Sequence, residues 1–437
     1  MSNELNIESN TKQETKKCPR CGKILPLDRF RIVQKRDAKP YIRSECRDCE
    51  AEYAKEYMAL KKEQMDVFDE NIEIVYERKY KEIHLARILD LAQTGLDLPL
   101  MGEDEIFVQL MQYPGSWLSN YGRMIRKSYN KYRLLKGNGT KNGLSYTVRE
   151  HICEDGKWIS TDKHIDVTSA VIETFIVNPD VASNTRIWHR GDKGSDYYYR
   201  NLYPVTSDQY SIIRDHYKRT GEDSEEYILK VMNDIRFKPE DWARKAFRPT
   251  LCGVGYHGCS DVDTDSEAYV KWKNMIERCY NQNSLQYAPQ YTDCTVCDEW
   301  LNFSNFRFWY ETHKYGSRPL SLDKDILLKG NTVYCPECCS LVPKDINLLM
   351  ISTTGKDRHG LPIGVYAVKR RKGKFRAEMN AYGKIIKIGT YGSPEEAFQH
   401  YKEYKETFIK KIAEERKGQI TFPVYNAMMN WEVEITD

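Results

Sequence analysis

The chain has 437 residues, and its 67 Lys and Arg side chains nearly balance 64 Asp and Glu, which leaves a formal net charge of +3. With 40% apolar residues it can bury real cores, and its length predicts several domains. No apolar run approaches the roughly 18 residues of a membrane span, and the polar N-terminus lacks the apolar stretch of a signal peptide. We therefore expect a cytoplasmic protein without membrane contact, whose thirteen cysteines serve metal sites rather than disulfides.

The charge is distributed unevenly along the chain. The net charge is +4 over residues 1–64, −7 over 65–110, +6 over 111–220, −4 over 221–356, +7 over 357–418 and −3 over 419–437. Alternating basic and acidic blocks indicate modules with separate electrostatic surfaces. A nucleic-acid partner, which the whole-chain charge disfavours, therefore stays open for the three basic blocks.

Residues 1–64 contain two C-x2-C pairs, Cys18 with Cys21 and Cys46 with Cys49. Two such turns complete a tetrahedral site of four thiolates, which predicts structural zinc because no coordination position stays open. The 24 residues between the pairs alternate basic and apolar side chains and predict a short hairpin. Their basic groups either contact phosphate or form a solvated surface. A helix is expected from about Asp48 to about Ala92. It extends into a segment over residues 65–110 that is expected to be a helical linker.

Residues 111–215 have a mixed pattern, with strands expected over 144–152 and 157–165 and a helix over 168–177. The segment 117–123 (WLSNYGR) resembles the VSNxGR motif that precedes many phage HNH homing endonucleases. More residues fall in the order that these nucleases show: Val171, Phe175, Asn178, Pro179, His189, Asp192, Asn201 and Leu202. A helical connector over residues 216–250 is expected to follow.

The resemblance implies a ββα-metal unit that hydrolyses DNA phosphodiester bonds with Mg²⁺ or Mn²⁺. His189 matches the general base that activates water, and Asn201 matches the residue that secures the hairpin. The family's two metal-ligand positions hold Trp188 and Tyr210, which are poor ligands for a hard cation. Either Asp192 or Asp196 substitutes for them, or the fold is retained for DNA binding with its catalysis lost.

Residues 251–356 form a cysteine-bearing module whose segment 322–347 resembles a part of phage proteins of the homing-endonuclease type. By role it is similar to a second, degenerate HNH unit. Asp323 and Asn347 would then bind a divalent cation, while Lys324 stands where the base should be. The alternative is that Asp323 and Asp325 cap a hairpin and Asn347 caps a helix.

The same module contains two further C-x2-C pairs. They predict a second zinc site, with Cys339 as an alternative ligand. The four cysteines are Cys294, Cys297, Cys335 and Cys338.

Residues 357–418 carry five segments (364–366, 374–377, 383–384, 388–391 and 395–397) that resemble the Apetala/ethylene-response-factor DNA-binding domain. The resemblance implies a three-stranded antiparallel sheet packed on one helix, with the sheet in the major groove. Independently, Ser393-Pro394 starts a helix with a capping box. Residues 358–387 hold nine Lys or Arg and one Glu, which favours DNA contact over a merely solvated basic sheet. The expected contacts are Arg370, Arg371, Lys374, Arg376, Lys384 and Lys387.

Residues 419–437 are expected to form an acidic tail, partly packed through Phe422, Tyr425 and Trp431. The whole pattern predicts an α+β, multidomain protein that contacts double-stranded DNA. It is either an HNH-type endonuclease or a DNA-binding protein descended from one. A third reading is an RNA-binding or assembly protein that reuses zinc folds.

Overall fold

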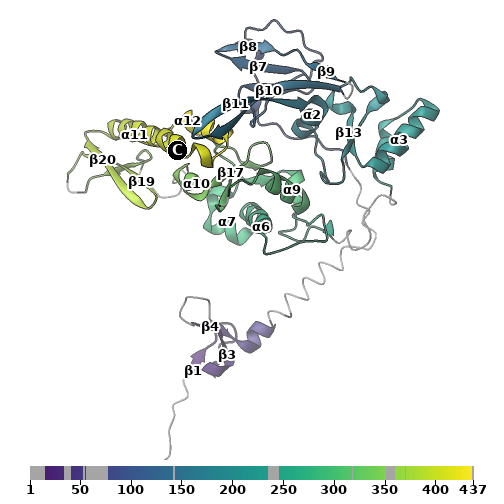
Figure 1. Ribbon diagram of the computed structural model, residues 1–437. Coiled ribbons are helices and arrows are strands. Elements are labelled where there is room, and N and C mark those ends of the chain that lie inside the picture. Colours follow the sequence, from purple (N-terminus) through teal and green to yellow (C-terminus); the bar gives the residue numbers. More distant parts are fainter. Residues whose placement is uncertain are drawn as a thin grey trace, which may run out of the picture. The chain divides into compact units, whose positions relative to one another are not determined.

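A computed structural model describes residues 15–33, 41–52, 55, 77–140, 143–234, 246–316, 318–350, 360–369 and 371–435. The chain divides into two compact units, Met1–Val75 and Tyr76–Asp437 (Figure 1). This boundary falls inside the segment that the sequence assigns to a linker. No helix in the described ranges is both long and apolar enough to cross a membrane.

The first unit contains two short antiparallel sheets, drawn in purple in Figure 1. Residues 47–52 are helical, which agrees with the helix expected from about Asp48. Phe30 is fully buried against Cys18, Cys46 and Cys49, so the cysteines form most of the core of this unit. The strands are β1 (Thr15–Lys17), β2 (Ile24–Pro26), β3 (Phe30–Val33) and β4 (Tyr41–Cys46).

The expected continuation of that helix to about Ala92 is wrong for residues 77–92, and residues 56–76 lie outside the described part. Residues 77–92 are extended, and their backbone bonds to other segments, as where the Lys81 N–H donates to the carbonyl of Phe175. These partners replace the hydrogen bonds that a helix makes within itself. Two 3₁₀ turns interrupt the segment, η2 (Leu85–Arg87) and η3 (Leu91–Gln93).

The second unit opens with an antiparallel sheet in the order β5–β6–β7–β8, followed by a long hairpin, β10–β11. The hairpin turns at Asp155 and Gly156, both with positive φ, which a tight Asp-Gly turn requires. Helix α2 begins where Asp166 accepts the N–H of Ser169, and its apolar side packs on the hairpin. The strands and the helix that the sequence predicts over residues 144–177 are confirmed. The bounds are β5 (Phe107–Gln109), β6 (Ser116–Ser119), β7 (Met124–Ser128), β8 (Lys131–Leu134), β9 (Asn138–Thr140), β10 (Gly143–Glu154), β11 (Lys157–Asp166) and α2 (Val167–Phe175).

A short antiparallel hairpin and two helices come next, in the order strand, strand, helix, helix. Thr206 and Gln209 form a capping box at the start of the first helix, and Gly221 ends it in the left-handed conformation. Trp188 and Ile213 bring the hairpin and the helices into one core. The elements are β12 (Arg186–His189), β13 (Leu202–Val205), α3 (Ser207–Thr220) and α4 (Glu225–Met232).

The following region is mainly helical, and Trp272, Met275 and Ile276 of α6 are buried in its core, as their helical spacing predicts. Two small sheets complete it. Strand β14 pairs in parallel with β16, and β15 pairs antiparallel with β17, directly before α10. The bounds are α6 (Glu267–Tyr280), α7 (Gln282–Tyr287), β14 (Thr295–Val296), α8 (Asp298–Leu301), α9 (Phe303–His313), β15 (Leu320–Asp323), β16 (Val333–Tyr334), β17 (Ser340–Pro343) and α10 (Lys344–Met350).

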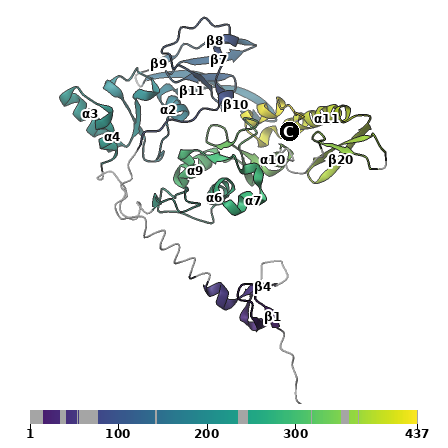
Figure 2. The ribbon, with the colours of Figure 1, turned by 180° about the vertical axis from the view of Figure 1, so that it is seen from behind.

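The last region is a three-stranded antiparallel sheet in the order β18–β19–β20 with helix α11 on one face, as predicted (Figure 1, Figure 2). Helix α11 starts at the predicted place, since Ser393 accepts the N–H of Glu396 and Pro394 is its first residue. The bounds are β18 (Val365–Ala367), β19 (Phe375–Ala381), β20 (Lys384–Tyr391), α11 (Pro394–Glu415) and α12 (Phe422–Met429).

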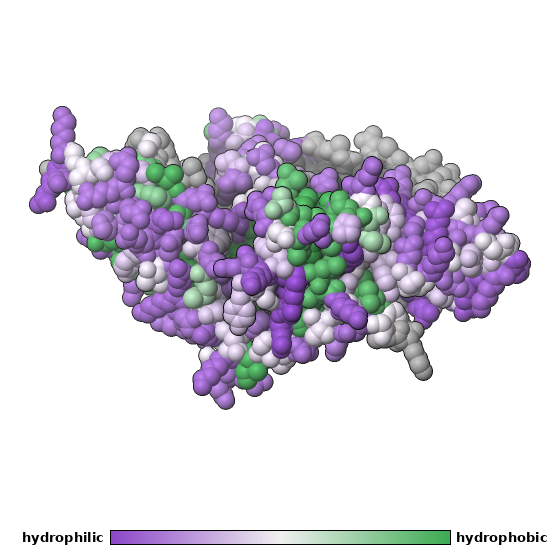
Figure 3. All heavy atoms as spheres, turned by 90° about the horizontal axis from the view of Figure 1, so that it is seen from above, coloured by the Kyte–Doolittle hydropathy of each residue, from purple (hydrophilic) through white to green (hydrophobic). Residues whose placement is uncertain are grey.

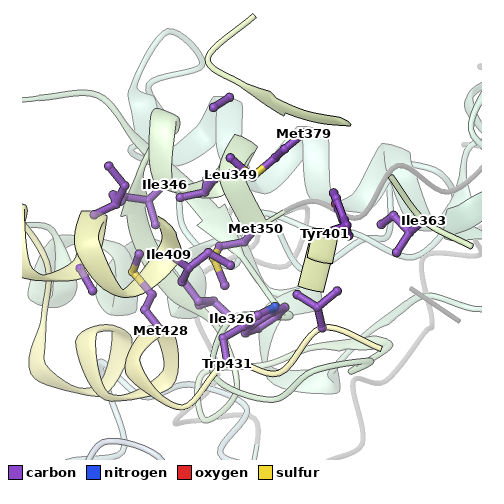
Figure 4. Close-up of a cluster of buried hydrophobic side chains, with 14 of the residues drawn as sticks. Ile326, Ile346, Leu349, Met350, Ile363, Met379, Tyr401, Ile409, Met428 and Trp431 are labelled. Atoms are coloured by element: carbon purple, nitrogen blue, oxygen red, sulfur yellow. The ribbon is translucent and has the colours of Figure 1, made fainter. Parts of the chain in front are cut away.

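One apolar core joins this sheet and its helix to the preceding region and to the C-terminal segment. Figure 4 shows Ile326 and Ile346 in the same cluster as Tyr401 and Trp431. Residues 419–437 are therefore more than a tail, because α12 buries Val424 and Met428 in this core. The face seen from above is largely hydrophilic, with a large area of apolar side chains near its middle and smaller ones beside it (Figure 3).

Candidate metal centre and nucleic-acid interface

Four cysteine side chains converge in the first unit. Cys18 and Cys21 belong to the turn between β1 and β2, whereas Cys46 ends β4 and Cys49 follows in the helical turn. All four sulfur atoms lie within 4.8 Å of one another, and Cys18 Sγ is 3.9 Å from Cys49 Sγ. A tetrahedron with metal–sulfur bonds of about 2.3 Å has edges of about 3.8 Å. The cluster can therefore hold a metal ion.

The backbone favours the thiolate of one of these cysteines. The amide N–H groups of Cys21 and Cys46 lower the pKa of Cys18 to about 6, and the N–H of Cys46 lies 3.4 Å from its sulfur. Burial and the neighbouring thiols raise the pKa of Cys49 instead. A divalent cation would stabilise all four thiolates together, so metal binding removes this conflict.

The four cysteines of the second unit that the sequence pairs for zinc are not brought together. In the part of the chain that the structure describes, the N-terminal four are the only His, Cys, Asp and Glu side chains that gather in a group of three or more at ligand distance. Cys294 and Cys297 flank β14, whose extended residues separate them, whereas a zinc knuckle needs a tight turn between its cysteines. Burial raises the pKa of both thiols, which favours the neutral form.

The WLSNYGR segment forms the turn between β6 and β7, and its side chains hold that turn. Ser119 Oγ accepts the N–H groups of Tyr121 and Arg123 over 3.2 Å and 3.0 Å. Arg123 Nε donates to the buried carboxylate of Glu105 over 2.9 Å, and Arg123 Nη2 contacts the other oxygen. The polar residues of the motif thus act first on the local fold.

The same turn also positions the loop that follows His189. The carbonyl of Asn120 accepts the N–H of Tyr199, and the ring of Tyr121 stacks on Tyr198 with centroids 4.4 Å apart. Both tyrosine hydroxyls donate to Asp104, over 2.7 Å and 2.8 Å. The motif therefore fixes the backbone of the 197–199 segment from one side.

Gly122 allows the closest approach in this contact. Its φ is +79°, and a Cβ atom placed on it would lie 2.5 Å from Tyr197 Cβ and 2.8 Å from Val167 Cγ1. Any larger residue would push the loop away from α2. Glycine is required here by both its conformation and its size.

His189 ends β12, and hydrogen-bond partners face both nitrogens of its ring. Nδ1 lies 3.1 Å from the carbonyl oxygen of Asp196, and Nε2 lies 3.5 Å from Thr168 Oγ1. Because a carbonyl only accepts, Nδ1 carries the proton, and Nε2 of the neutral ring is left as the acceptor. Asn201 Nδ2 donates to Asp196 Oδ2 over 2.7 Å, so the predicted Asn holds the loop that orients the predicted base.

Trp188 and Tyr210, the positions that the sequence resemblance matches to metal ligands, lie in a hydrophobic core. Trp188 is fully buried, the ring of Tyr210 packs against it at 5.6 Å, and Trp188 Nε1 donates to Asp223 over 2.8 Å. Of the two alternative ligands, Asp196 is engaged within its own loop and Asp192 is exposed. Among the described residues, no group of three ligating side chains forms beside His189.

Asp323 and Lys324 have structural partners of their own. Asp323 is buried, and its Oδ1 accepts the backbone N–H groups two and three residues further on, over 2.8 Å and 2.7 Å. Asp323 thus caps the backbone of this turn, which is one of the two roles that the sequence left open for it. Burial acts to lower the pKa of Lys324, but the ion pair with Asp325 at 2.9 Å raises it overall, so Lys324 is a poor base. Asn347 lies inside α10 and does not cap it.

The C-terminal sheet has one covered and one open face. Ala377 and Met379 of β19 point toward α11 and are buried in the shared core. Arg376 and Glu378 alternate with these two residues along β19 and therefore point the other way. The strand register places two rows on the open face, Tyr366 with Arg376 and Thr390, and Glu378 with Lys387.

Four of the six predicted DNA contacts are exposed on or beside the open face. Arg376 and Lys387 stand on the face itself, and Arg371 and Lys374 lie exposed in the turn that leads into β19. Arg376 Nε pairs with Glu378 Oε1 at 2.7 Å, which orients the guanidinium and leaves its Nη edge for another partner.

The other two predicted contacts differ. Lys384 pairs with Ala381, a residue of the covered face, so its side chain leaves the sheet on the side of α11. The two-residue turn at Tyr382 and Gly383 sets this register, since both have positive φ. Arg370 lies outside the described residues.

A buried ion cluster joins distant segments of the second unit. Lys81 Nζ contacts Glu299 Oε2 at 2.8 Å and Glu337 Oε1 at 2.5 Å, and it donates to the carbonyl of Glu173 over 2.7 Å. Glu299 in turn accepts the N–H of Asn178. These residues line a cavity of about 580 Å³. Lys81 and Glu337 are 256 positions apart, so no local sequence pattern could have revealed the cluster.

Comparison of the chain with protein-family models, with curated proteins and with solved structures found no match. The functional conclusion therefore depends on the geometry of these sites and on the sequence motifs that led to them.

Proposed function

We propose that this protein binds double-stranded DNA through its C-terminal sheet. The observation that carries this proposal is the open face of β18–β19–β20, where Arg376 and Lys387 stand opposite the helix-covered side and Arg371 and Lys374 flank them. A sheet face of this width can enter the major groove, where Arg reads guanine edges and Lys meets phosphates.

The central hairpin serves this function as an HNH-like scaffold that keeps DNA binding without cleavage. It has the strand–strand–helix order of a ββα unit and an ordered His189. Trp188 and Tyr210, however, pack on each other where the related nucleases place metal ligands. Stabilising the charge of a cleaved phosphodiester requires such a metal, so the packing favours the binding protein over the nuclease.

The second candidate is an HNH-type endonuclease with His189 as general base and Mg²⁺ or Mn²⁺ as cofactor. The observation in its favour is the orientation of the ring, whose Nε2 is left as the acceptor because Nδ1 donates to Asp196. Only this nitrogen could take a proton from water.

Zinc is the metal that suits the N-terminal cysteines. Four thiolates fill a tetrahedral site and leave no position for substrate, so the ion stabilises the fold of this small unit. Zinc-binding cysteines must stay reduced, which agrees with a location in the reducing cytoplasm.

A cleavage assay separates the two candidates. Full-length protein is incubated with duplex phage or bacterial DNA and Mg²⁺ or Mn²⁺, beside His189→Ala and Asp323→Ala variants. Salt-dependent binding with intact DNA under both metals is the expected result. Cleavage that disappears in His189→Ala would establish the nuclease, whereas cleavage that disappears only in Asp323→Ala would move the chemistry to the second unit's cysteine-bearing region.

A further inference from the structure

Three arginines of the second unit, on strands β7, β8 and β10, act on one another, and one of them is paired with a carboxylate. Strands β7 and β8 pair Arg126 directly with Arg133, so both side chains share one face of the sheet. Arg149 of β10 acts electrostatically on Arg126, and it pairs with Asp162 at 2.9 Å across the hairpin. The negative charge of Asp162 also acts on Arg126, although Asp162 forms its ion pair with Arg149.

Arg126 and Arg133 have no counter-ion of their own. Among the described residues, no hydrogen bond or ion pair joins either guanidinium to an acidic side chain. Like charges placed directly opposite each other in adjacent strands destabilise the pairing. The loss of hydration and the charges of Arg133 and Arg149 lower the pKa of Arg126 accordingly. Asp162 offsets this repulsion only in part, because one carboxylate pairs with Arg149 and no ion pair is formed by Arg126 or Arg133 among the described residues.

The cluster borders the C-terminal region. His151 follows Arg149 by two positions in β10, so the two side chains are on the same face of the hairpin, and loss of hydration together with the charges of Arg126 and Arg149 lowers the pKa of the His151 ring. The same ring stacks on Phe422 of α12 with centroids 3.8 Å apart. The arginines thus lie next to the segment that packs on the helix behind the DNA-reading sheet.

We propose that Arg126, Arg133 and Arg149 form a phosphate-binding site that holds the backbone of duplex DNA. This inference rests on the proposed function and adds a contact separate from the C-terminal sheet. Planar guanidinium groups bind phosphate oxygens in pairs, and a phosphate anion would relieve the repulsion between them. Contacts to phosphate position the duplex without reading its sequence, so this site adds affinity and leaves the choice of sequence to the sheet.

The test compares Arg126→Gln/Arg133→Gln with the wild-type full-length protein, and Lys157→Gln at the tip of the β10–β11 hairpin is the control. Duplex affinity is measured as a function of salt. Each lost phosphate contact lowers the slope of log K against log salt by about 0.9, so the double variant should lose between about 1 and 2 in slope and roughly tenfold in affinity near 0.1 M salt. Preference for a selected sequence over random DNA should stay unchanged, and Lys157→Gln should behave as wild type.

A thermal melt and an inorganic phosphate titration complete the experiment. The melting temperature of the free double variant should equal or exceed that of wild type, since a repulsion is removed, whereas a merely structural role of the arginines would lower it. If the wild-type protein binds DNA and the double variant has the same salt slope, this inference alone is overturned. Stabilisation by inorganic phosphate that the double variant loses, without a change in DNA slope, would assign the site to free phosphate. No duplex binding by wild type would overturn the proposed function as well.

Discussion

Gly122 is the residue whose replacement should disturb the predicted DNA-binding scaffold most directly. Alanine at φ +79° would be strained, and its Cβ would collide with Tyr197 and Val167. We expect Gly122→Ala to cost about 2–4 kcal/mol of unfolding free energy, which combines backbone strain with overpacking. Gly156→Ala is the matched control, because Gly156 has φ +72° but open space around it, and it should cost only about 1 kcal/mol. Urea unfolding measures both, and equal losses would contradict the close approach.

His313 makes stability depend on pH in a predictable direction. The residue is exposed, but its ring stacks on Trp309 at 4.7 Å, its Nδ1 lies 2.8 Å from the Trp309 carbonyl, and partial loss of hydration lowers its pKa. The folded state then favours the neutral ring, so this contribution is full above the unfolded pKa of about 6.5 and is lost as the pH falls below it.

The stability difference between wild type and His313→Gln should therefore shrink when the pH is lowered from 7.5 to 5.5. Urea unfolding at the two pH values checks this. A difference that grows in acid would show that the folded state prefers the protonated ring.

At the scale of elements, Lys81 ties the extended 77–92 segment to α8 and to the turn that carries Glu337. Lys81→Met would leave the carboxylates of Glu299 and Glu337 buried without a cation. Breaking such a buried pair costs about 3–5 kcal/mol.

The nearby Lys79→Met is the matched control. Lys79 pairs with Asp298 at 3.0 Å, but both side chains are about half exposed, so this loss should stay below about 1 kcal/mol. Guanidinium chloride unfolding of the two variants, at a salt concentration kept equal, measures the difference. Similar losses would mean that the buried cluster contributes little.

Sequence patterns predicted elements well where the signal is local. The helix start at Ser393 and Pro394 and the two strands of the long hairpin depend on a few adjacent residues. The helix expected up to Ala92 failed because the backbone of this segment bonds to distant strands. Which face of the sheet Lys384 leaves was not predictable, because the register depends on the backbone conformation of the turn at Tyr382 and Gly383.

The candidate site was predictable to a similar extent. The two N-terminal C-x2-C pairs have a spacing that only a shared metal explains well, and they do converge. The second set failed because the extended residues of β14 lie between Cys294 and Cys297, where a zinc knuckle needs a tight turn. The Lys81 cluster and the group of three arginines could not be predicted from the sequence, because only the tertiary fold brings their residues together.

At the scale of the molecule, the division into two compact units predicts that they unfold separately. Removing the metal with a chelator should unfold Met1–Val75, whose core consists largely of cysteines, and leave Tyr76–Asp437 folded. Limited proteolysis with mass spectrometry should show new cuts only in the first unit.

Two controls accompany this experiment. Elemental analysis should find about one zinc per chain, and Cys46→Ser should reproduce the effect of the chelator. Cys153→Ser, in the half-buried hairpin, should not. A chelated protein with the protease pattern of the untreated one would contradict a structural metal.

The most direct test of the central claim, that the open face of the C-terminal sheet reads duplex DNA, is the affinity of full-length variants for a duplex selected from a random pool by the wild-type protein. Arg376→Ala should weaken this binding by about 1–3 kcal/mol and relax the sequence preference, whereas Lys384→Ala, on the covered side, should change it little. Equal affinities of wild type and Arg376→Ala would contradict the account.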